Sequence, residues 1–508
     1  MDGQKYYYGQ DLPDSLVHEC LEANSYGDGI LLKAILADKK GSRVLYDVGR
    51  KKFLVFEDGA HHYKIDNKNL ILAWVEKVCM RYAAYSNAIQ EQVSKAQAEK
   101  QTDRANYLAK IQQKIHRRIE RLRGDRGRKA CVDFLRTTED NNSICVQSSE
   151  MDADPWLLAG PNGVLDLRTA EVRPGSPKDK CLKATPIPLP KDPLTETSPT
   201  LESFLWESLE NQAKIDFLRR LFGYSLTGLI EEHIILILSS LNGGTGKTTL
   251  MELVSKAMGE LCSSIRAELL LDPGRAQSSS APTSDIMDLQ GKRLVYASES
   301  DEARRFSPSR VKWLTGGDSL VGRRAHSPDE ERFVPSHKLV LITNNEPHAP
   351  ADDHAFWRRV LKVDFPYSFV DNPREGFEKK RDKLLQHKLQ KELTGVLAWM
   401  IRGNIDWQHQ GLNPPSEVKM AVEDYRRSED LIQDWIDENC ITETDPDQAH
   451  KLSETSNNLY KDFSNWFQEH HGKRVPSLQW FGRRMSKKFK KDKSRGSNTY
   501  FGVQLVSS

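Results

Sequence analysis

The hydrophobic pattern before Pro155 is mostly helical, and no proline interrupts it after Pro13. One apolar stripe recurs at intervals of three and four residues, at Leu108, Ile111, Ile115, Ile119 and Leu122. The other faces of this helix carry Lys110, Lys114, Arg117, Arg118 and Arg121. Because charge runs are usually solvated, we favour a solvent-exposed bundle helix over a DNA contact here.

In the middle third, the pattern changes to alternating strands and helices. Between Pro174 and Pro199 there are seven prolines in 26 residues, which prevents helix and indicates an extended connector. Apolar, strand-like runs follow at 234–240, 293–299 and 338–345, with helical stretches between them. This alternation predicts an α/β domain with a mostly parallel sheet.

The last residues predict a small basic module after the polar stretch at 443–458. Ser477 can cap a helix that runs to Phe489, with Leu478, Phe481 and Met485 facing inward. Its outward side chains are basic, at Arg483, Arg484, Lys487 and Lys488, and the residues that follow suggest a short basic wing. A helix with a wing fits phosphate-dominated DNA binding, whereas a solubilising tail would not explain the ordered apolar positions.

Composition sets the limits of the class. A chain of 508 residues should hold three or so domains, and 38% hydrophobic with 29% charged residues is ordinary for a soluble protein. No apolar run reaches the roughly 18 residues that span a bilayer, and the N-terminus resembles no export signal, so we expect a cytoplasmic protein without a membrane partner. The seven cysteines are widely spaced, which argues for reduced thiols and against zinc.

The net charge of +2 does not itself suggest a nucleic-acid partner, but the basic residues are clustered. Residues 104–129 hold ten lysines and arginines against two acids, and residues 471–508 hold ten against one.

A candidate phosphate-binding loop follows the strand at 234–240. It consists of Gly243, Gly244, Thr245, Gly246, Lys247, Thr248 and Thr249. The glycines let backbone N–H groups approach the phosphates of ATP, Lys247 would neutralise the β- and γ-phosphates, and the Thr248 hydroxyl would hold Mg²⁺. The full pattern has glycine where this chain has Leu241, so a glycine-rich turn with a chance lysine is the alternative.

Polar residues at the ends of the next two strands would complete this site. Glu299 can enter the Mg²⁺ shell and polarise the attacking water, with Asp301 as second choice, unless these acids form an ordinary solvated loop. Asn344, rather than Asn345, can orient that water, although a simple turn explains the pair nearly as well.

Two adjacent arginines, Arg358 and Arg359, lie between apolar residues downstream of the third strand. Guanidinium groups in such a place need an anion. In a ring, that anion can be the γ-phosphate bound by the adjacent subunit.

These motifs, in this order, resemble the superfamily 3 helicases, particularly the phage and plasmid primase-associated branch that includes the poxvirus primase-helicase. GGTGKTT, GKRLVYASESDE, WLTGGDSLVGRR, ITNNEP and FWRR are similar to its phosphate loop, acidic motif, intervening motif, sensor and arginine finger. Residues 161–174 are similar to the junction that ends the family's helicase-associated domain, and YKDFSNWF with WFGRRM to its terminal winged helix.

The resemblance implies an α/β fold with an AAA+-like P-loop ATPase core, a mostly helical N-terminal domain and a C-terminal winged-helix domain. We expect a helicase-associated domain at 1–175, the proline-rich connector at 176–200, the helicase domain at 201–427 and the winged helix at 428–508. It also implies a β-hairpin that grips DNA in the ring channel, with strands at 319–326 and 332–338. Its candidate contacts are Arg323, Arg324, His326 and Lys338, against the alternative of an ordinary exposed hairpin.

The resemblance implies an ATP- and Mg²⁺-dependent DNA helicase that acts in the replication of a phage, plasmid or integrated mobile element in a bacterial cell. It also implies a homo-oligomer, which we expect to be a hexamer. Single-stranded DNA would occupy the channel and duplex or origin DNA the C-terminal domain. A separately encoded primase or polymerase is an expected partner, because no acidic catalytic constellation precedes the connector. A replication initiator that uses ATP only to assemble is the alternative, and a packaging or defence ATPase fits the paired arginines less well.

Overall fold

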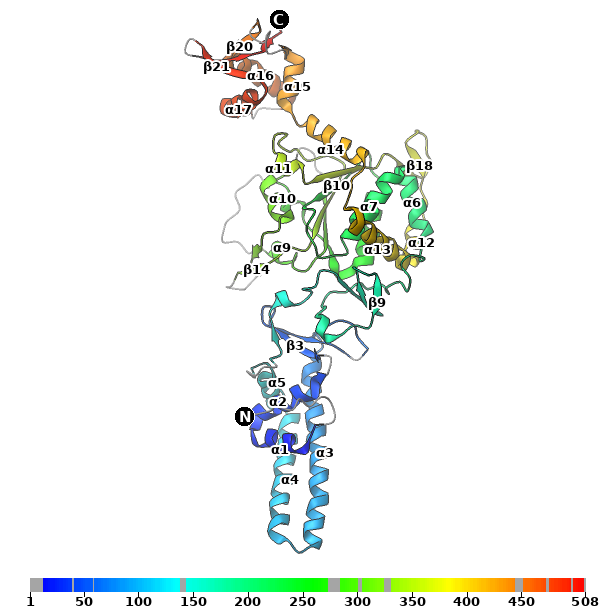
Figure 1. Ribbon diagram of the computed structural model, residues 1–508, viewed down its shortest axis with the longest axis vertical. Helices are drawn as coiled ribbons and strands as arrows, with labels where there is room; N and C mark the ends of the chain where they lie inside the picture. The colour runs from blue at the N-terminus through cyan, green and yellow to red at the C-terminus, as the bar shows by residue number, and fades with distance from the viewer. Residues whose placement is uncertain are drawn as a thin grey trace.

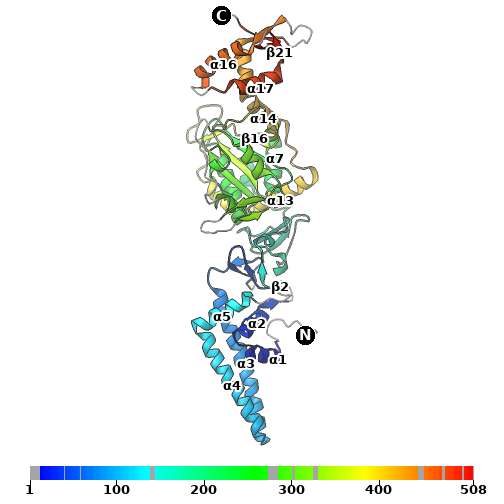
Figure 2. The same ribbon diagram turned by 90° about the vertical axis from the view of Figure 1, so that its left-hand side faces the viewer.

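The computed structural model describes residues 12–38, 41–57, 59–137, 143–272, 284–299, 304–323, 330–443, 451–471, 475–494 and 497–506. These residues form an elongated molecule of mixed α/β fold (Figure 1). A helical N-terminal unit lies at one end, an α/β unit in the middle and a small C-terminal unit at the other end, and the view turned by 90° shows the same order (Figure 2). In the described part of the chain, no helix is both long and apolar enough to cross a bilayer.

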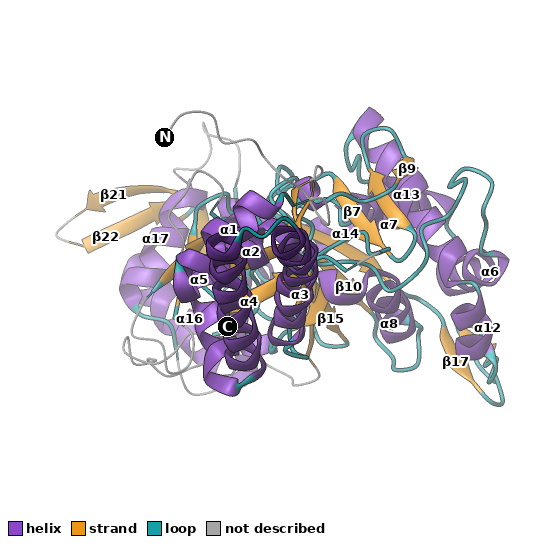
Figure 3. Cartoon of the chain, turned by 90° about the horizontal axis from the view of Figure 1, so that it is seen from below, coloured by secondary structure: helices purple, strands orange, loops and turns teal. Residues whose placement is uncertain are grey.

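The N-terminal unit is built mainly from helices. They are α1 (Asp14–Glu22), α2 (Asn24–Leu36), α3 (Leu70–Ala98), α4 (Thr102–Arg123) and α5 (Asp125–Thr137). Helices α3 and α4 lie side by side and project away from the rest of the chain, toward the viewer when the molecule is seen from below (Figure 3). The predicted stripe of α4 faces α3, and Leu108, Ile111 and Ile115 are buried in the shared core.

Short strands lie between α2 and α3 and after α5. They are β1 (Ala37–Asp38), β2 (Gly41–Ser42), β3 (Val44–Asp47), β4 (Lys52–Val55), β5 (Lys64–Ile65) and β6 (Cys145–Val146). The first two pair with each other, and the others form a sheet in the order β5-β4-β3-β6.

The charged faces of α4 are not uniformly solvated, which corrects the expectation for Arg118. This side chain is buried and donates to both carboxylate oxygens of Asp28, at 3.1 and 3.0 Å. The Tyr82 hydroxyl donates to the same carboxylate at 2.9 Å, so the buried charge has several partners. Lys114, by contrast, pairs with Glu22 at the surface, at 2.7 Å.

A three-stranded antiparallel sheet joins the N-terminal unit to the centre: β7 (Leu157–Gly160), β8 (Gly163–Asp166) and β9 (Glu171–Arg173). Leu158 and Leu165 belong to the hydrophobic core of the central unit, so packing extends that unit upstream of the boundary expected at residue 175. The proline-rich connector lies against the same unit. Its Leu189 is buried, and the Thr185 hydroxyl donates to the carbonyl of Ala257 at 2.6 Å.

The central sheet is wholly parallel and has the order β11-β12-β15-β10-β16. Its strands are β10 (Ile235–Ser239), β11 (Cys262–Ser264), β12 (Leu294–Glu299), β15 (Lys338–Thr343) and β16 (Val360–Asp364). The three strands predicted from apolar runs are therefore present as β10, β12 and β15. Two smaller pairs lie outside the sheet: β13 (Leu320–Gly322) with β14 (Glu331–Phe333), and β17 (Ser368–Val370) with β18 (Glu378–Lys380).

Helices cover both faces of this sheet, which is why β10 is apolar and buried from Ile235 to Leu238. They are α6 (Pro199–Leu209), α7 (Gln212–Tyr224), α8 (Lys247–Met258), α9 (Ser284–Met287), α10 (Pro308–Thr315), α11 (His354–Trp357), α12 (Leu385–Lys391) and α13 (Leu393–Gln410). Leu236 and Leu238 pack in one core with α7, α8 and α13, whereas Ile235 and Ile237 pack in another with α10 and α11.

The C-terminal unit has its own aromatic core around Trp435, Phe463 and Phe481. Helix α14 (Ser416–Ser428) leads to it from the centre, and its helices are α15 (Leu431–Asn439), α16 (Ser456–His471) and α17 (Leu478–Lys488). Its strands are β19 (Cys440–Thr442), β20 (Ser453–Thr455), β21 (Lys490–Ser494), β22 (Ser497–Phe501) and β23 (Val503–Leu505). The segment predicted as a wing is the antiparallel pair of β21 and β22.

The helix predicted at 477–489 is α17. The hydroxyl of Ser477 accepts a hydrogen bond from the backbone N–H of Trp480 at 3.3 Å, as expected for a helix cap. Phe481 and Met485 are fully buried, but Leu478 is 42% exposed, so the expectation that it faces inward is wrong. In the first turn of the helix, Leu478 lies at the edge of the core.

We expect Arg118→Met to destabilise the N-terminal unit by about 3 to 5 kcal/mol, because it leaves the buried carboxylate of Asp28 without its main partner. Lys114→Met is the matched control, since it removes an exposed ion pair from the same helix and should cost less than about 1 kcal/mol. Urea unfolding monitored by circular dichroism measures both changes. Equal effects of the two substitutions would contradict this assignment.

Candidate nucleotide-binding site

The carboxyl ends of four neighbouring strands meet at one edge of the central sheet. Ser239 at the end of β10 is in register with Thr343 of β15 and with Asp364 of β16, and Thr343 is in register with Glu299 of β12. The residues that follow these strands therefore lie close together, as the topology of a parallel sheet requires.

The loop between β10 and α8 has the backbone geometry that its glycines permit. Gly244 and Gly246 have φ angles of +71° and +93°, in the left-handed region that favours glycine. A Cβ atom at Gly246 would come within 2.8 Å of the Phe204 ring, so the close packing of this loop also requires glycine there. Leu241 is 97% exposed, and its side chain therefore does not obstruct the loop.

Lys247 is the first residue of α8, and its side chain is buried at this edge of the sheet. Its ammonium donates to Asn344 Oδ1 at 2.9 Å, to Thr245 Oγ1 at 3.2 Å and to Ser240 Oγ. Burial lowers the pKa of Lys247 to about 8. Sequence reasoning missed Ser240, because a serine after a strand carries no signal of its own.

The two asparagines after β15 have different surroundings. The Asn344 side chain accepts hydrogen bonds from Lys247 and, at 3.2 Å, from the Ser240 hydroxyl. The backbone N–H of Asn345 instead donates to the Thr343 hydroxyl at 3.1 Å, which closes a tight turn. The structure thus brings Asn344, the residue favoured from sequence, to the lysine.

A cleft of about 860 Å³ opens beside this cluster. Residues 243–249 of the loop line it, with Asn344 and Ser298 from the adjacent strands and Phe204, Phe369 and Arg381 from outside the sheet. Thr248 is exposed toward this cleft, and Thr249 is half-buried. Glu299 ends β12 at the same edge, whereas Asp301 lies outside the described residues.

Arg358 and Arg359 lie at the opposite edge of the sheet. Both precede Val360, which is in register with Ile235 at the start of β10. The Arg358 side chain is exposed, and no hydrogen bond or ion pair joins its guanidinium to another described residue. Arg359 is half-buried and donates to the carbonyl of Ala355 at 2.5 Å, and both burial and the charge of Arg358 lower its pKa.

The expected hairpin exists as the antiparallel pair β13 and β14, but Lys338 does not belong to it. Lys338 begins the core strand β15, is buried, and donates to the carbonyl of Thr227 at 2.6 Å. Its ammonium also lies 4.3 Å from the centre of the Tyr224 ring. The expectation that Lys338 contacts DNA is therefore wrong. Arg323 follows β13 and is half-buried, and Arg324 and His326 lie outside the described residues.

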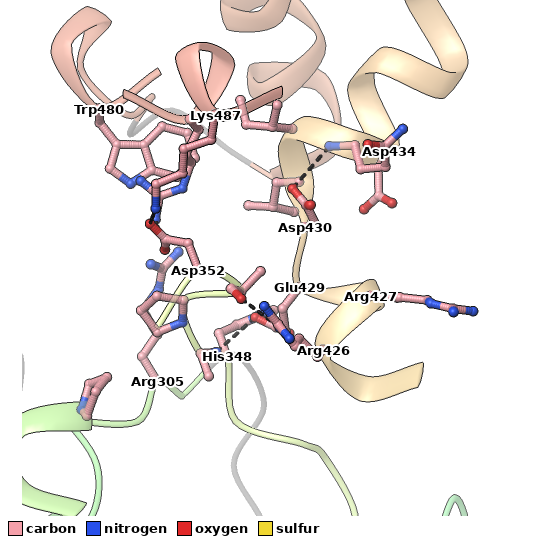
Figure 4. A pocket seen from close by; sticks show the side chains of 18 of the residues that line it. Arg305, His348, Asp352, Arg426, Arg427, Glu429, Asp430, Asp434, Trp480 and Lys487 are labelled. Atoms are coloured by element: carbon pink, nitrogen blue, oxygen red, sulfur yellow. Dashed lines mark hydrogen bonds and ion pairs between the residues drawn. The ribbon is translucent and has the colours of Figure 1, made fainter. Parts of the chain in front are cut away.

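Basic side chains of α17 face the central unit across a second cleft of about 880 Å³ (Figure 4). Arg484 and Lys487 form ion pairs with Asp352, which precedes α11, at 2.7 and 3.1 Å. Lys488 pairs with Asp430 at 2.9 Å. The sequence suggested that these three side chains point into solvent, but acids distant in sequence form ion pairs with them. Arg483 also belongs to α17, and its side chain lies outside the described part of the structure.

The charge of Asp352 depends on this contact. Burial acts against its carboxylate, but Lys487 and Arg484 outweigh that effect and lower its pKa. The guanidinium of Arg484 also stacks over the ring of Trp480, 3.9 Å from its centre. The contact therefore combines charge pairing with an aromatic surface.

Comparisons with known proteins agree with the motifs. Residues 33–210 match the family model described as D5 N terminal like. The chain is 23% identical over 501 residues to a protein of Acanthamoeba polyphaga mimivirus that is named as a helicase. The alignment covers 94% of this chain and 49% of that protein. The chain is also 24% identical over 379 residues to a protein of African swine fever virus that is named as a primase. That alignment covers 70% of this chain and 38% of the viral protein.

These matches support a primase-helicase-like family of superfamily 3 helicases for this chain. Invertebrate iridescent virus 6 has another relative named as a helicase, 24% identical over 408 residues, with 74% of this chain and 40% of that protein covered. The chain thus spans about half or less of the length of these relatives. Among solved structures, the C-terminal region of NrS-1 is similar with a TM-score of 0.48 and 13% identity, covering 94% of this chain and 100% of that chain.

Proposed function

We propose that the chain is an ATP-hydrolysing, ring-forming DNA helicase that acts in the replication of a phage, plasmid or other mobile element. The observation that carries this proposal is the buried ammonium of Lys247, held beside a glycine-rich loop at the carboxyl edge of a parallel sheet. Viral relatives named as helicases and primases support the same class of activity.

The site fits a nucleoside triphosphate with Mg²⁺. The three acceptors of Lys247 are neutral oxygens, so a polyphosphate can bind the ammonium without breaking an ion pair and would supply the missing counter-charge. The start of α8 adds backbone N–H groups and the positive end of a helix dipole. In this proposal Thr248 and Glu299 hold Mg²⁺, Glu299 or Asp301 polarises the attacking water, and Asn344 orients it.

The position of the paired arginines supports a site shared between subunits. Arg358 and Arg359 lie beside the start of β10, and the phosphate loop follows its end. The strand has five residues, so roughly 16 Å separates the two places at about 3.3 Å per residue. Arg358 is therefore remote from the loop of its own chain, yet it is exposed and available to another subunit. Arg359 is the second candidate, although its contact with Ala355 restrains it. We infer a closed ring of six subunits, as the resemblance to superfamily 3 helicases implies.

The remaining parts of the proposal concern DNA. The central unit would be an AAA+-like P-loop core, and the hairpin of β13 and β14 would contact single-stranded DNA in the channel through Arg323, Arg324 and His326. The C-terminal unit would be a winged helix that binds duplex DNA through α17 and the β21–β22 pair. A separate primase or polymerase remains the expected partner.

Lys247→Ala should abolish ATP binding, because it removes the charge that the bound phosphates require. Glu299→Gln should retain ATP binding and lose at least about 10²-fold in turnover, since the carboxylate acts on the attacking water rather than on bound ATP. Equilibrium binding of a fluorescent ATP analogue and phosphate release measure the two effects. Wild-type turnover by Glu299→Gln would transfer the role to Asp301.

Arg358→Ala alone should lose about 10³-fold or more in hydrolysis, because the finger stabilises charge on the transferred phosphate. Mixed with Lys247→Ala subunits, it should regain part of this activity, since one kind of interface then pairs an intact loop with an intact finger. Arg359→Ala, mixed in the same way, is the parallel variant. The assignment to another subunit is wrong if neither arginine variant complements the lysine variant although mixed oligomers form.

Asp352→Asn should strengthen duplex DNA binding several-fold and make it more salt-dependent. In the wild type, Arg484 and Lys487 must break their ion pairs with Asp352 before they contact a phosphate, and in the variant they need not. Asp434→Asn is the control: it lies in the same cleft, and its carboxylate has no ion pair in the described part of the chain. Fluorescence anisotropy at several salt concentrations measures both. Identical affinities for the two variants would show that this contact does not compete with DNA.

A further inference from the structure

Arg381 lies at the mouth of the nucleotide cleft, directly beside the phosphate loop. A Cβ atom built on Gly244 would come within 3.8 Å of its Nη2 atom. The side chain is exposed and lines the same cleft as Lys247. Neither the sequence motifs nor the proposed chemistry gives this arginine a role.

A short ladder of backbone hydrogen bonds fixes Arg381 against the loop. The N–H of Phe369 in β17 donates to the carbonyl of Gly244 at 2.9 Å. The N–H of Arg381, just after β18, donates to the carbonyl of Val370 at 2.9 Å. The backbone of Arg381 is therefore two hydrogen-bonded steps from the phosphate loop.

The same segment is anchored from its other side to the end of α6. The ammonium of Lys379 donates to the carbonyl of Glu207 and to the carboxylate of Glu210, both at 2.6 Å. The Tyr367 hydroxyl donates to that carboxylate as well. This anchoring holds the backbone of the segment at the cleft, so Arg381 needs only a change of side-chain rotamer to meet a ligand there.

Other cations that line the cleft have partners of their own. Lys388 forms an ion pair with Asp382 at 2.7 Å, and Lys383 pairs with Asp371 at 3.5 Å. No hydrogen bond or ion pair joins the guanidinium of Arg381 to any residue that the structure describes. An arginine fixed at a phosphate loop without a carboxylate partner is suited to a phosphate ligand, since its planar fork matches two phosphate oxygens.

We propose that Arg381 binds phosphate oxygens of the nucleotide held by its own subunit, from the side of the cleft opposite the sheet. This inference rests on the proposed binding of ATP and adds a ligand that acts in cis, in contrast to Arg358. The phosphates would then lie between the ammonium of Lys247 and the guanidinium of Arg381. Such a contact favours polyphosphates over a nucleoside monophosphate, because it depends on the number of phosphate charges within reach.

Binding of fluorescent ATP and AMP analogues to the full chain tests this role. Arg381→Ala should weaken binding of the ATP analogue about tenfold or more, as expected for loss of a hydrogen bond between charged groups, and change AMP binding much less. Arg381→Lys should restore part of the affinity. Lys388→Ala is the matched control, because it removes one positive charge from the same cleft, and it should stay within about twofold of wild type.

Equal ATP affinities of Arg381→Ala and Lys388→Ala would overturn the proposal. If the wild-type chain itself bound no ATP analogue, the proposed function would fail, and this inference with it.

Subunit mixing separates cis from trans action. At ATP concentrations far below saturation, where Arg381→Ala subunits hydrolyse slowly, adding Lys247→Ala subunits should not restore hydrolysis, because each variant damages the cleft of its own subunit. Regained hydrolysis in this mixture would show that Arg381 acts across an interface and would overturn the assignment in cis.

Discussion

The burial of one ammonium group organises the central unit. A lysine removed from water is costly unless its charge meets acceptors, and Lys247 meets them only where the ends of β10 and β15 lie next to each other. The parallel register of these strands brings Ser240 and Asn344 together, and the glycine-rich loop adds Thr245. Sheet order, loop conformation and the start of α8 are thus parts of one arrangement.

This arrangement also gives the central unit two different edges. The carboxyl edge carries the glycine-rich loop and the residues around it, whereas Arg358 lies at the amino edge. A single chain therefore presents the cleft beside Lys247 at one edge and, at the other, an exposed arginine whose side chain pairs with no residue that the structure describes. In a ring, such edges can meet, so that hydrolysis depends on assembly.

Sequence reasoning identified elements whose signal is local. The apolar runs that form β10, β12 and β15 alternate with helical stretches, and this alternation predicted a mostly parallel sheet. Strand ends then placed Lys247 and Asn344 at one edge, and the capping serine at Ser477 marked the start of α17.

The errors concern charged residues whose partners lie far away in the sequence. Lys338 looked like a hairpin residue but begins a core strand, where a distant carbonyl accepts from it. Arg118 and Arg484 looked solvated, yet acids 90 and 132 residues away hold them. Arg381 carries no motif, because its role depends on a segment that tertiary contacts bring to Gly244. Such pairings depend on the fold, and the pattern of a single segment does not contain them.

Unwinding of a forked DNA duplex tests the central claim most directly, because it separates a motor from a protein that uses ATP only to assemble. We expect the chain to release the displaced strand in the presence of ATP and Mg²⁺, and to lose this activity when Lys247 is replaced by alanine. DNA-stimulated ATP hydrolysis without any strand release would contradict the account and identify the protein as an ATP-regulated initiator.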